Sequence, residues 1–152
     1  MDEGESGQRT LGATRNAPLQ LLLPAIPVAA RTARLHLRSW LQRERWPDEP
    51  SDDISYGVSE AVTNAVEHAY PPGVDGATVT VTAEVELLPT GMRRVRVRVS
   101  DRGRWRPIPQ VPCGRGRGFT LMKGLMDRVV ITRGDGTTAG TEVVLVSPPV
   151  AP

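Results

Sequence analysis

The sequence predicts an α+β fold: a two-layer α/β sandwich in which helices cover one face of a mixed, mostly antiparallel sheet. Two segments, residues 28–46 and the segment after Ser51, repeat apolar residues at helical spacing. Five other segments are short apolar runs or alternate apolar and polar residues, as strands with one buried face do. The order is strand, helix, helix, strand, strand, loop, helix, strand, strand, which is typical of helices packed on one side of a sheet.

The ordered part of the chain is expected to be one domain, residues 17–147. Residues 1–16 are polar and contain several glycines without any period, so we interpret them as a disordered tail. The domain begins with an apolar run, residues 19–23, that is closed by Pro24 and indicates a strand. The proline-containing end, residues 148–152, is expected to be a second, loose tail.

Two helices are expected next. The helix over residues 28–46 starts just after Pro27, which suits a first helical turn. Pro47 and Pro50 are expected to end it. Ser51 is the predicted N-cap of the second helix, which stops at a Pro-Pro-Gly sequence.

An antiparallel hairpin is expected from residues 78–87 and 94–99, joined by a turn at 89–91. The second strand carries three arginines on one face, and such a stripe could bind nucleic acid. A charge-paired surface explains the stripe better, because two glutamates of the first strand face it. The expected pairs are Glu84 with Arg98 and Glu86 with Arg96.

The rest of the domain is expected to contain a loop, a short helix and two strands. Residues 101–118 are rich in glycine, proline and arginine and lack a regular period. The helix is expected over residues 119–126, and the closing strands over residues 128–133 and 141–146.

The composition limits the class of protein. One cysteine, Cys113, excludes an internal disulfide and fits a reducing cytoplasm, where we expect the chain to be located. No apolar run approaches the roughly 20 residues of a membrane-spanning helix. A net charge of +2 does not predict nucleic-acid binding. We therefore expect a cytoplasmic protein that binds neither membranes nor nucleic acid directly.

One stretch of the second helix, residues 59–70, has two chemically different faces. At about 100° per residue, its valines and alanines form an apolar arc, while a carboxylate, an amide and an imidazole form a polar arc. Glu60, Asn64 and His68 are four residues apart, so that neighbours touch. Carboxylate and amide oxygens suit Mg²⁺ better than zinc. A solvated helix face would show the same spacing, so the helix alone leaves both interpretations open.

Two glycine-containing motifs lie further along the chain. Asp101-Arg102-Gly103 follows a strand, where a carboxylate can accept a hydrogen bond from an exocyclic amine and a glycine lets a flat ligand approach. Alone, this motif is also an ordinary turn. Residues 114–118, Gly-Arg-Gly-Arg-Gly, precede the short helix, where free backbone N–H groups and the helix dipole favour an anion. Alone, this segment fits a polyphosphate loop and a flexible linker equally.

Together the motifs resemble those of the GHKL ATPase superfamily, which has the Bergerat fold of sensor histidine kinases and type II topoisomerases. They occur in the family's order, and the resemblance covers roughly residues 19–146. The chain is most similar to the stand-alone anti-sigma factor serine kinases of bacteria, because no phospho-acceptor hairpin is visible and the second glycine box is compact. The resembling motifs are Glu60-x-x-x-Asn64-x-x-x-His68 (N box), Asp101-x-Gly103 and Gly116-x-Gly118 (glycine boxes) and Gly140-Thr141 (terminal Gly-Thr).

The resemblance implies an ATP-binding anti-sigma factor that phosphorylates a serine of an anti-sigma antagonist protein and also binds a sigma factor. Glu60 would be the general base, and Asn64 would coordinate Mg²⁺ on the phosphates of ATP. Asp101 would bind the adenine amine, Thr141 would support the same ring, and Gly103 would lie beside it. Relatives also suggest a homodimer. The other implied ATP-binding residues are His68, Arg115, Gly116, Arg117 and Gly118.

One position departs from the family pattern. Trp105 stands where the first glycine box of many relatives continues to a second glycine. The alternative function is therefore a non-catalytic, nucleotide-sensing module that binds its protein partner. A third hypothesis, a nucleic-acid-binding domain, rests on the arginines alone.

Overall fold

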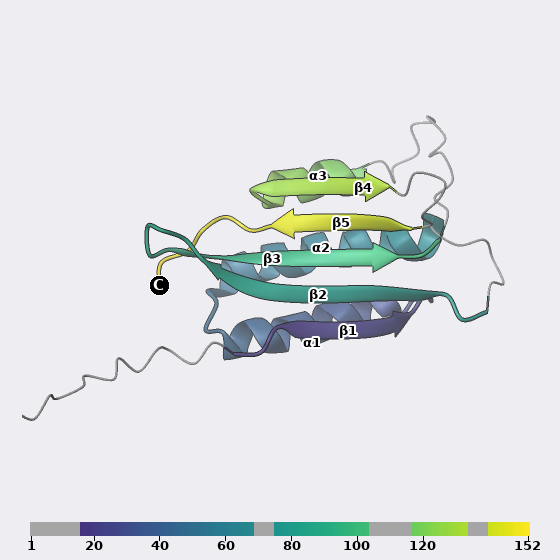
Figure 1. Ribbon diagram of the computed structural model, residues 1–152, viewed down its shortest axis with the longest axis horizontal. Helices are drawn as coiled ribbons and strands as arrows, with labels where there is room; N and C mark the ends of the chain where they lie inside the picture. Colours follow the sequence, from purple (N-terminus) through teal and green to yellow (C-terminus); the bar gives the residue numbers. More distant parts are fainter. Residues whose placement is uncertain (1–15, 69–74, 104–116, 134–139) are drawn as a thin grey trace, which may run out of the picture.

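The computed structural model describes residues 16–68, 75–103, 117–133 and 140–152, with only the backbone described for Arg117 and Gly118. The described residues form two layers: a five-stranded sheet in the order β1-β2-β3-β5-β4, and three helices on one of its faces (Figure 1). The predicted α+β sandwich is confirmed. The elements are β1 (Leu19–Pro24), α1 (Ala29–Arg43), α2 (Asp48–His68), β2 (Thr78–Leu87), β3 (Arg93–Asp101), α3 (Arg117–Leu125), β4 (Arg128–Arg133) and β5 (Thr141–Val146).

The core lies between the sheet and the helices. Val81, Val99 and Val143 lie side by side in the register of β2, β3 and β5, and all three are buried. Full burial of such a side chain contributes roughly 1.5–3 kcal/mol, so this row stabilises the middle of the sheet. The alternation of valines with polar residues that predicted β2 and β3 is therefore explained by one buried face.

α2 is held close to the sheet by its apolar face. Val58, Ala61 and Val62 are buried, as the helical periodicity predicts. At Gly57, a Cβ atom would lie 3.3 Å from the Leu145 Cδ2 atom of β5, so a small residue is needed at this crossing. No helix in the described part of the chain is long and apolar enough to cross a membrane.

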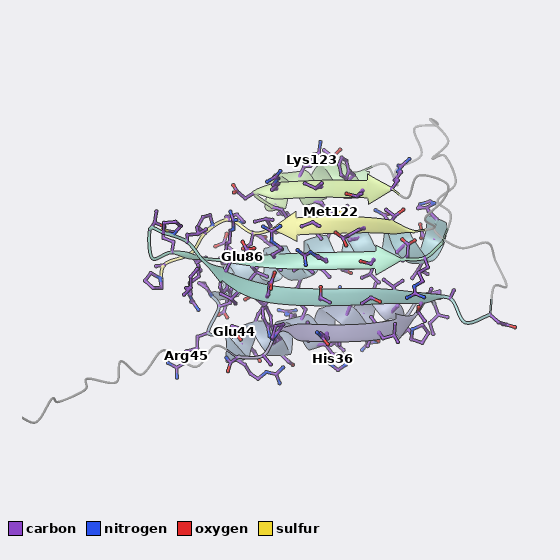
Figure 2. All side chains as sticks on the ribbon, viewed as in Figure 1. His36, Glu44, Arg45, Glu86, Met122 and Lys123 are labelled. Carbon is purple, nitrogen blue, oxygen red and sulfur yellow. The ribbon has the colours of Figure 1, made fainter. Side chains whose placement is uncertain are left out.

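α1 ends in a left-handed turn. Arg45 has a φ of 54°, and the N–H of Trp46 donates a hydrogen bond to the Leu41 carbonyl at 2.9 Å. Glycine usually occupies such a position because it has no Cβ to clash with the backbone. Glu44 and Arg45 lie together at this end of α1 (Figure 2). An arginine therefore occupies a position that glycine would fill with less strain.

α2 begins earlier than predicted. We expected Pro47 and Pro50 to close the first helix and Ser51 to cap the second. α2 instead starts at Asp48, which places Pro50 in its first turn. A proline is tolerated there because the first N–H groups of a helix have no intrahelical partner. The acidic residues of this first turn also favour its positive end.

The register of the β2–β3 hairpin differs from the prediction by two residues. A hydrogen bond from the Leu88 N–H to the Met92 carbonyl, 2.9 Å long, closes the turn in the observed register. A shift of two residues keeps every side chain on the same face, so the face prediction is unaffected. All four pairings between the described strands are antiparallel, so this part of the sheet is not mixed. The observed pairs are Glu84 with Arg96 and Glu86 with Arg94.

Charge pairing on this surface is confirmed, with different partners. Glu86, near the hairpin turn (Figure 2), accepts hydrogen bonds from the Nε atoms of Arg96 and Arg94, the latter at 2.7 Å. The bond from Arg96 is the largest cause that holds the pKa of Glu86 below its ordinary value, although partial burial acts in the opposite direction. The same bond raises the pKa of Arg96. Two arginines of the stripe thus share one carboxylate, which lowers the net positive charge there and disfavours nucleic-acid binding.

The chain after β5 is held against β3. The side-chain oxygen of Ser147 accepts a hydrogen bond from the Val95 N–H at 2.8 Å. Val150 and Arg93 exchange two backbone hydrogen bonds of 2.8 and 2.9 Å. We expected a loose tail over residues 148–152, but Val150 within it is fixed by these two bonds.

Candidate functional site

α2 carries three of the predicted site residues along one stripe. Glu60, Asn64 and His68 follow one another at successive turns and are only partly buried. Ala61 and Ala65, which lie between them in sequence, are buried. Residues four apart on a helix are neighbours in space. The apolar face therefore fixes the helix on the sheet and leaves this polar stripe accessible.

Asp101 is a nearly buried carboxylate at the end of β3. The residue is 8% exposed, and its Oδ1 atom accepts a hydrogen bond from the Gly103 N–H at 3.0 Å. An Asx turn of this kind is the ordinary interpretation of an Asp-x-Gly motif. Burying a carboxylate costs free energy unless it is hydrogen-bonded, and a simple surface turn does not need that burial. The Asx turn is therefore present, and the carboxylate that forms it is buried rather than solvated.

Thr141 begins β5 directly beside this carboxylate. It is the register partner of Asp101 and is 5% exposed. Gly140, which precedes it, has a φ of 124°, a conformation that L side chains rarely adopt. The predicted Gly-Thr pair thus has a structural basis: the glycine permits the turn, and the threonine is then placed next to Asp101.

Segments far apart in the sequence meet at one end of the molecule. α2 and β3 end there, and α3 and β5 begin there, on the right in Figure 1. α2 packs against α3, β3 and β5. The structure therefore brings the C-terminal half of α2 to the end of the sheet that carries Asp101 and Thr141.

The predicted phosphate loop lies mostly outside the described residues. Arg117 and Gly118 are the first residues of α3, so their backbone lies at a helix N-terminus. N–H groups at such an end lack intrahelical partners and, with the helix dipole, favour a phosphate group. The phosphate-binding role of the loop stays a prediction. Arg115, Gly116, Trp105 and Cys113 all fall within residues 104–116, which are not described.

The described residues are compatible with a nucleotide and Mg²⁺. The Asp101 carboxylate is buried and held in one orientation by a backbone N–H. A group that accepts a hydrogen bond selectively from a ligand amine needs such a fixed orientation. Asn64 supplies an amide oxygen of the kind that Mg²⁺ accepts. In the described ranges no group of three His, Cys, Asp or Glu side chains could enclose a metal ion. A Mg²⁺ ion bound there would take its other ligands from phosphate and water, as is usual at kinase sites.

The fold and this arrangement define a nucleotide-binding domain of the α+β class. Residues 23–147 match the family of the histidine kinase-like ATPase domain. The match covers most of the 152 residues, and the chain belongs to this family. The resemblance inferred from the four sequence motifs is therefore confirmed.

Within this family, the chain is similar to two named relatives and to one solved structure. The chain is 30% identical over 141 residues to the serine-protein kinase RsbW of Listeria innocua, covering 83% of this chain and 86% of that protein. It is 38% identical over 104 residues to the anti-sigma F factor of Pasteuria penetrans, covering 59% and 65%. A solved structure of RsbU and RsbW domains from Mycobacterium tuberculosis aligns with a TM-score of 0.68 and 31% identity, over 90% of this chain and 34% of that one.

One polar feature, a groove between α1 and α2, was not predicted from the sequence. Arg31, Arg34 and Arg38 of α1 line it. Their spacing of three and four residues places them on one helix face, and that spacing was the available signal.

Proposed function

We propose that this chain is an ATP-dependent protein serine kinase of the anti-sigma type. It binds ATP with Mg²⁺ and transfers the γ-phosphoryl group to a serine of an anti-sigma antagonist protein. It also binds a sigma factor, so that the chain switches between two protein partners. The observation that carries the proposal is the buried Asp101–Thr141 pair at the end of the sheet where the Glu60–Asn64 stripe of α2 also lies. The printed names of the relatives, serine-protein kinase and anti-sigma factor, support the same function.

The chemistry suits these residues because phosphoryl transfer depends mainly on positioning and charge neutralisation. Glu60 accepts the proton of the attacking serine hydroxyl. Asn64 holds Mg²⁺, which supplies positive charge against the phosphates. Asp101 accepts a hydrogen bond from the adenine amine, and Thr141 supports the ring beside it.

The remaining proposed contacts are with the phosphates. Gly116 and Gly118 bind the phosphates through their backbone N–H groups in this proposal. The dipole of α3, which begins at Arg117, adds positive potential there. Arg115 or Arg117 neutralises the γ-phosphate, and His68 lines the pocket at the end of α2. These assignments rest on the sequence motif and on the position of α3.

The proposal is tested by mass spectrometry of a candidate antagonist protein after incubation with the chain, ATP and Mg²⁺. We expect one stoichiometric phosphoserine, and none when ATP or the chain is left out. An antagonist that binds the chain but stays unmodified would instead support the alternative, a nucleotide-sensing module without catalysis. Trp105 in the first glycine box motivates that alternative.

A homodimer is the proposed assembly. β1 is an edge strand of the described sheet, and Leu22 on it is 71% exposed. Ile26 and Val28, which follow β1, are also exposed apolar residues. Apolar side chains beside a free strand edge favour pairing with a second copy. Sedimentation analysis should give twice the monomer mass, and Leu22→Glu should shift the chain towards the monomer; a wild-type chain that sediments as a monomer contradicts the proposal.

A further inference from the structure

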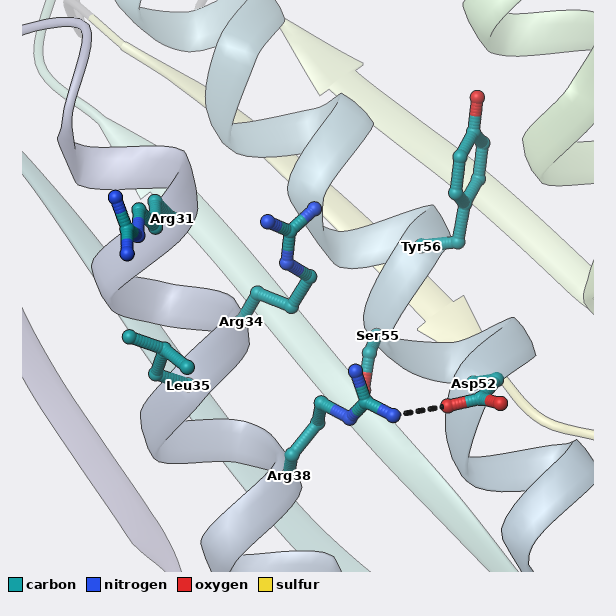
Figure 3. Close-up of a pocket in the computed structure, with 7 residues that line it drawn as sticks. All are labelled: Arg31, Arg34, Leu35, Arg38, Asp52, Ser55 and Tyr56. Atoms are coloured by element: carbon teal, nitrogen blue, oxygen red, sulfur yellow. Dashed lines mark hydrogen bonds and ion pairs between the residues drawn. The ribbon is translucent and has the colours of Figure 1, made fainter.

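A groove of about 560 Å³ lies between α1 and α2. Arg34 and Arg38 extend from α1 towards α2, and Arg31 lies nearer the N-terminus of α1 (Figure 3). Asp52 and Ser55 line the groove from α2. Its volume falls within the roughly 300–1,000 Å³ typical of small-ligand sites.

The groove carries an excess of positive charge. Arg38 Nη2 lies 2.7 Å from Asp52 Oδ1, so one of its three arginines is paired. Arg31 and Arg34 have no ion-pair partner among the residues that the structure describes. Three guanidinium groups and one carboxylate leave a net charge of +2. A phosphate monoester carries about −1.5 to −2 near neutral pH and matches this charge.

A buried donor lies in the same place. Ser55 is 2% exposed, and its hydroxyl oxygen has no hydrogen-bond partner. Most buried side-chain polar atoms have one, so an unpartnered hydroxyl needs an explanation. Ser55 of α2 and Arg38 of α1 both line the groove, and the Arg38 guanidinium is drawn over the Ser55 side chain in Figure 3. A ligand oxygen bound next to Arg38 would satisfy this hydroxyl.

We propose that the α1–α2 groove binds the dianionic phosphate of a phosphate monoester or of inorganic phosphate. Arg34 and Arg38 hold the anion, and Arg38 exchanges Asp52 for phosphate oxygens. The Ser55 hydroxyl donates a further hydrogen bond to the anion. Guanidinium groups suit the role because their paired N–H donors match phosphate oxygens bidentately.

This site is separate from the proposed ATP site. Asn64 lies nine residues after Ser55, which is roughly 14 Å along the axis of α2 and about half a turn around it. The phosphate could belong to a free small molecule or to a phosphoserine on a protein. The assignment to a phosphoserine rests on the proposed kinase function. Binding of inorganic phosphate at the groove does not depend on that function.

The test follows amide signals of the full chain by NMR, without ATP and in a low-chloride buffer. Inorganic phosphate and a phosphoserine peptide are titrated separately. Saturable shifts are expected at residues 31–38 and 52–56, and they should strengthen from roughly pH 5 to 7 for the peptide, because its second pKa is about 6. A peptide that binds more tightly identifies a protein source, and equal affinities identify free phosphate; both support the site.

Two variants with opposite expected signs separate binding from folding. Arg34→Gln should weaken phosphate binding about tenfold, because it removes an exposed charge that has no described partner. Asp52→Asn should strengthen binding about threefold or more, since it frees Arg38 and removes a negative charge. Arg43→Gln, at the other end of α1, is the matched control and should leave the affinity unchanged.

Three outcomes would overturn the proposal. One is the absence of saturable shifts at the groove up to about 20 mM phosphate, because a dissociation constant above that concentration is too weak for a functional site. Another is a set of shifts confined to the neighbourhood of Asn64 and Asp101, which would place the anion in the proposed ATP site instead. The third is a peptide with glutamate in place of phosphoserine that binds as tightly, which would indicate an acidic protein partner. Arg34→Gln should bind ATP normally, so loss of the groove and loss of the nucleotide site are distinguishable.

Discussion

Gly140 and Asp101 approach each other so closely that no side chain fits between them. A Cβ atom at position 140 would lie 2.3 Å from the carbonyl oxygen of Asp101 and 3.3 Å from the Cα atom of Arg102. The approach is needed because Thr141, the next residue, pairs with Asp101 in the β3–β5 register. The start of β5 and the end of β3 therefore form one unit, and this unit sets the position of the Asp101 carboxylate.

Gly140→Ala should move β5 away from Asp101. The contact is with backbone atoms, which cannot rotate aside, and the φ of 124° is also unfavourable for alanine. We expect a loss of about 2–3 kcal/mol in the free energy of unfolding, measured by urea denaturation, together with weaker ATP binding. Gly91→Ala is the control: its φ is 82°, but nothing lies within 4 Å of the added atom. Equal costs for the two variants would contradict the close-contact explanation.

Glu60→Gln should remove phosphotransfer without removing the nucleotide. The amide keeps the size of the side chain but cannot accept the serine proton, and loss of a general base typically costs about 10²–10⁴-fold in rate. ATP affinity, measured by calorimetry, should stay unchanged. Glu49→Gln, in the exposed first turn of the same helix, should have the wild-type rate. Unchanged turnover in Glu60→Gln would exclude Glu60 as the base.

Arg45→Gly should stabilise the chain. Arg45 adopts the left-handed conformation after α1, where a Cβ atom is strained and glycine is not. Relief of this strain should raise the free energy of unfolding by about 0.5–1 kcal/mol. The gain is no larger because glycine also increases the freedom of the unfolded chain, which opposes folding. Arg43→Gly, inside the last turn of α1, should instead destabilise by a similar amount. A loss of stability in Arg45→Gly would show that the arginine side chain makes a contribution larger than the backbone strain.

Glu86→Gln should make stability less dependent on pH. The hydrogen bond from Arg96, more than that from Arg94, lowers the pKa of Glu86 in the folded chain. A lowered carboxyl pKa stabilises the fold above the unfolded value, about 4.3, and this contribution is lost as the pH falls through the folded pKa. The substitution should therefore cost about 0.5–1 kcal/mol near neutral pH and progressively less below about pH 4.

The measurement is urea denaturation at several pH values. Glu84→Gln is the control, because Glu84 lies across from Arg96 but is exposed, and no hydrogen bond to it is described. A Glu86→Gln difference that stays constant down to pH values below the folded pKa would contradict the account.

The sequence was sufficient where one face of an element is buried. The bounds of β4 and β5 match the predicted strands, and the apolar face of α2 is the predicted one. The hairpin register was wrong by two residues because that shift preserves the face of every side chain, and only the turn closed by Leu88 and Met92 distinguishes the registers. The start of α2 was missed because a proline in a first turn looks like a helix terminator.

For the candidate site, the sequence predicted the residue types but not their environment. The motif around Asp101 is indistinguishable from a surface turn until the burial of its carboxylate is known. The α1–α2 groove was missed because it depends on how two helices pack, and the pairing of Arg38 with Asp52 brings together residues fourteen positions apart. The predicted roles of Arg115 and Gly116 stay predictions, since both lie outside the described residues.

The nucleotide site is the central claim, and a calorimetric titration with ATP tests it most directly. The purified wild-type chain and Asn64→Ala are each titrated with and without Mg²⁺. The account predicts saturable binding by the wild-type chain that strengthens with Mg²⁺, and a loss of about tenfold or more of that affinity in Asn64→Ala, because the amide oxygen is a ligand of the cation. No binding by the wild-type chain at millimolar ATP, or the same Mg²⁺-dependent affinity in both proteins, would contradict it.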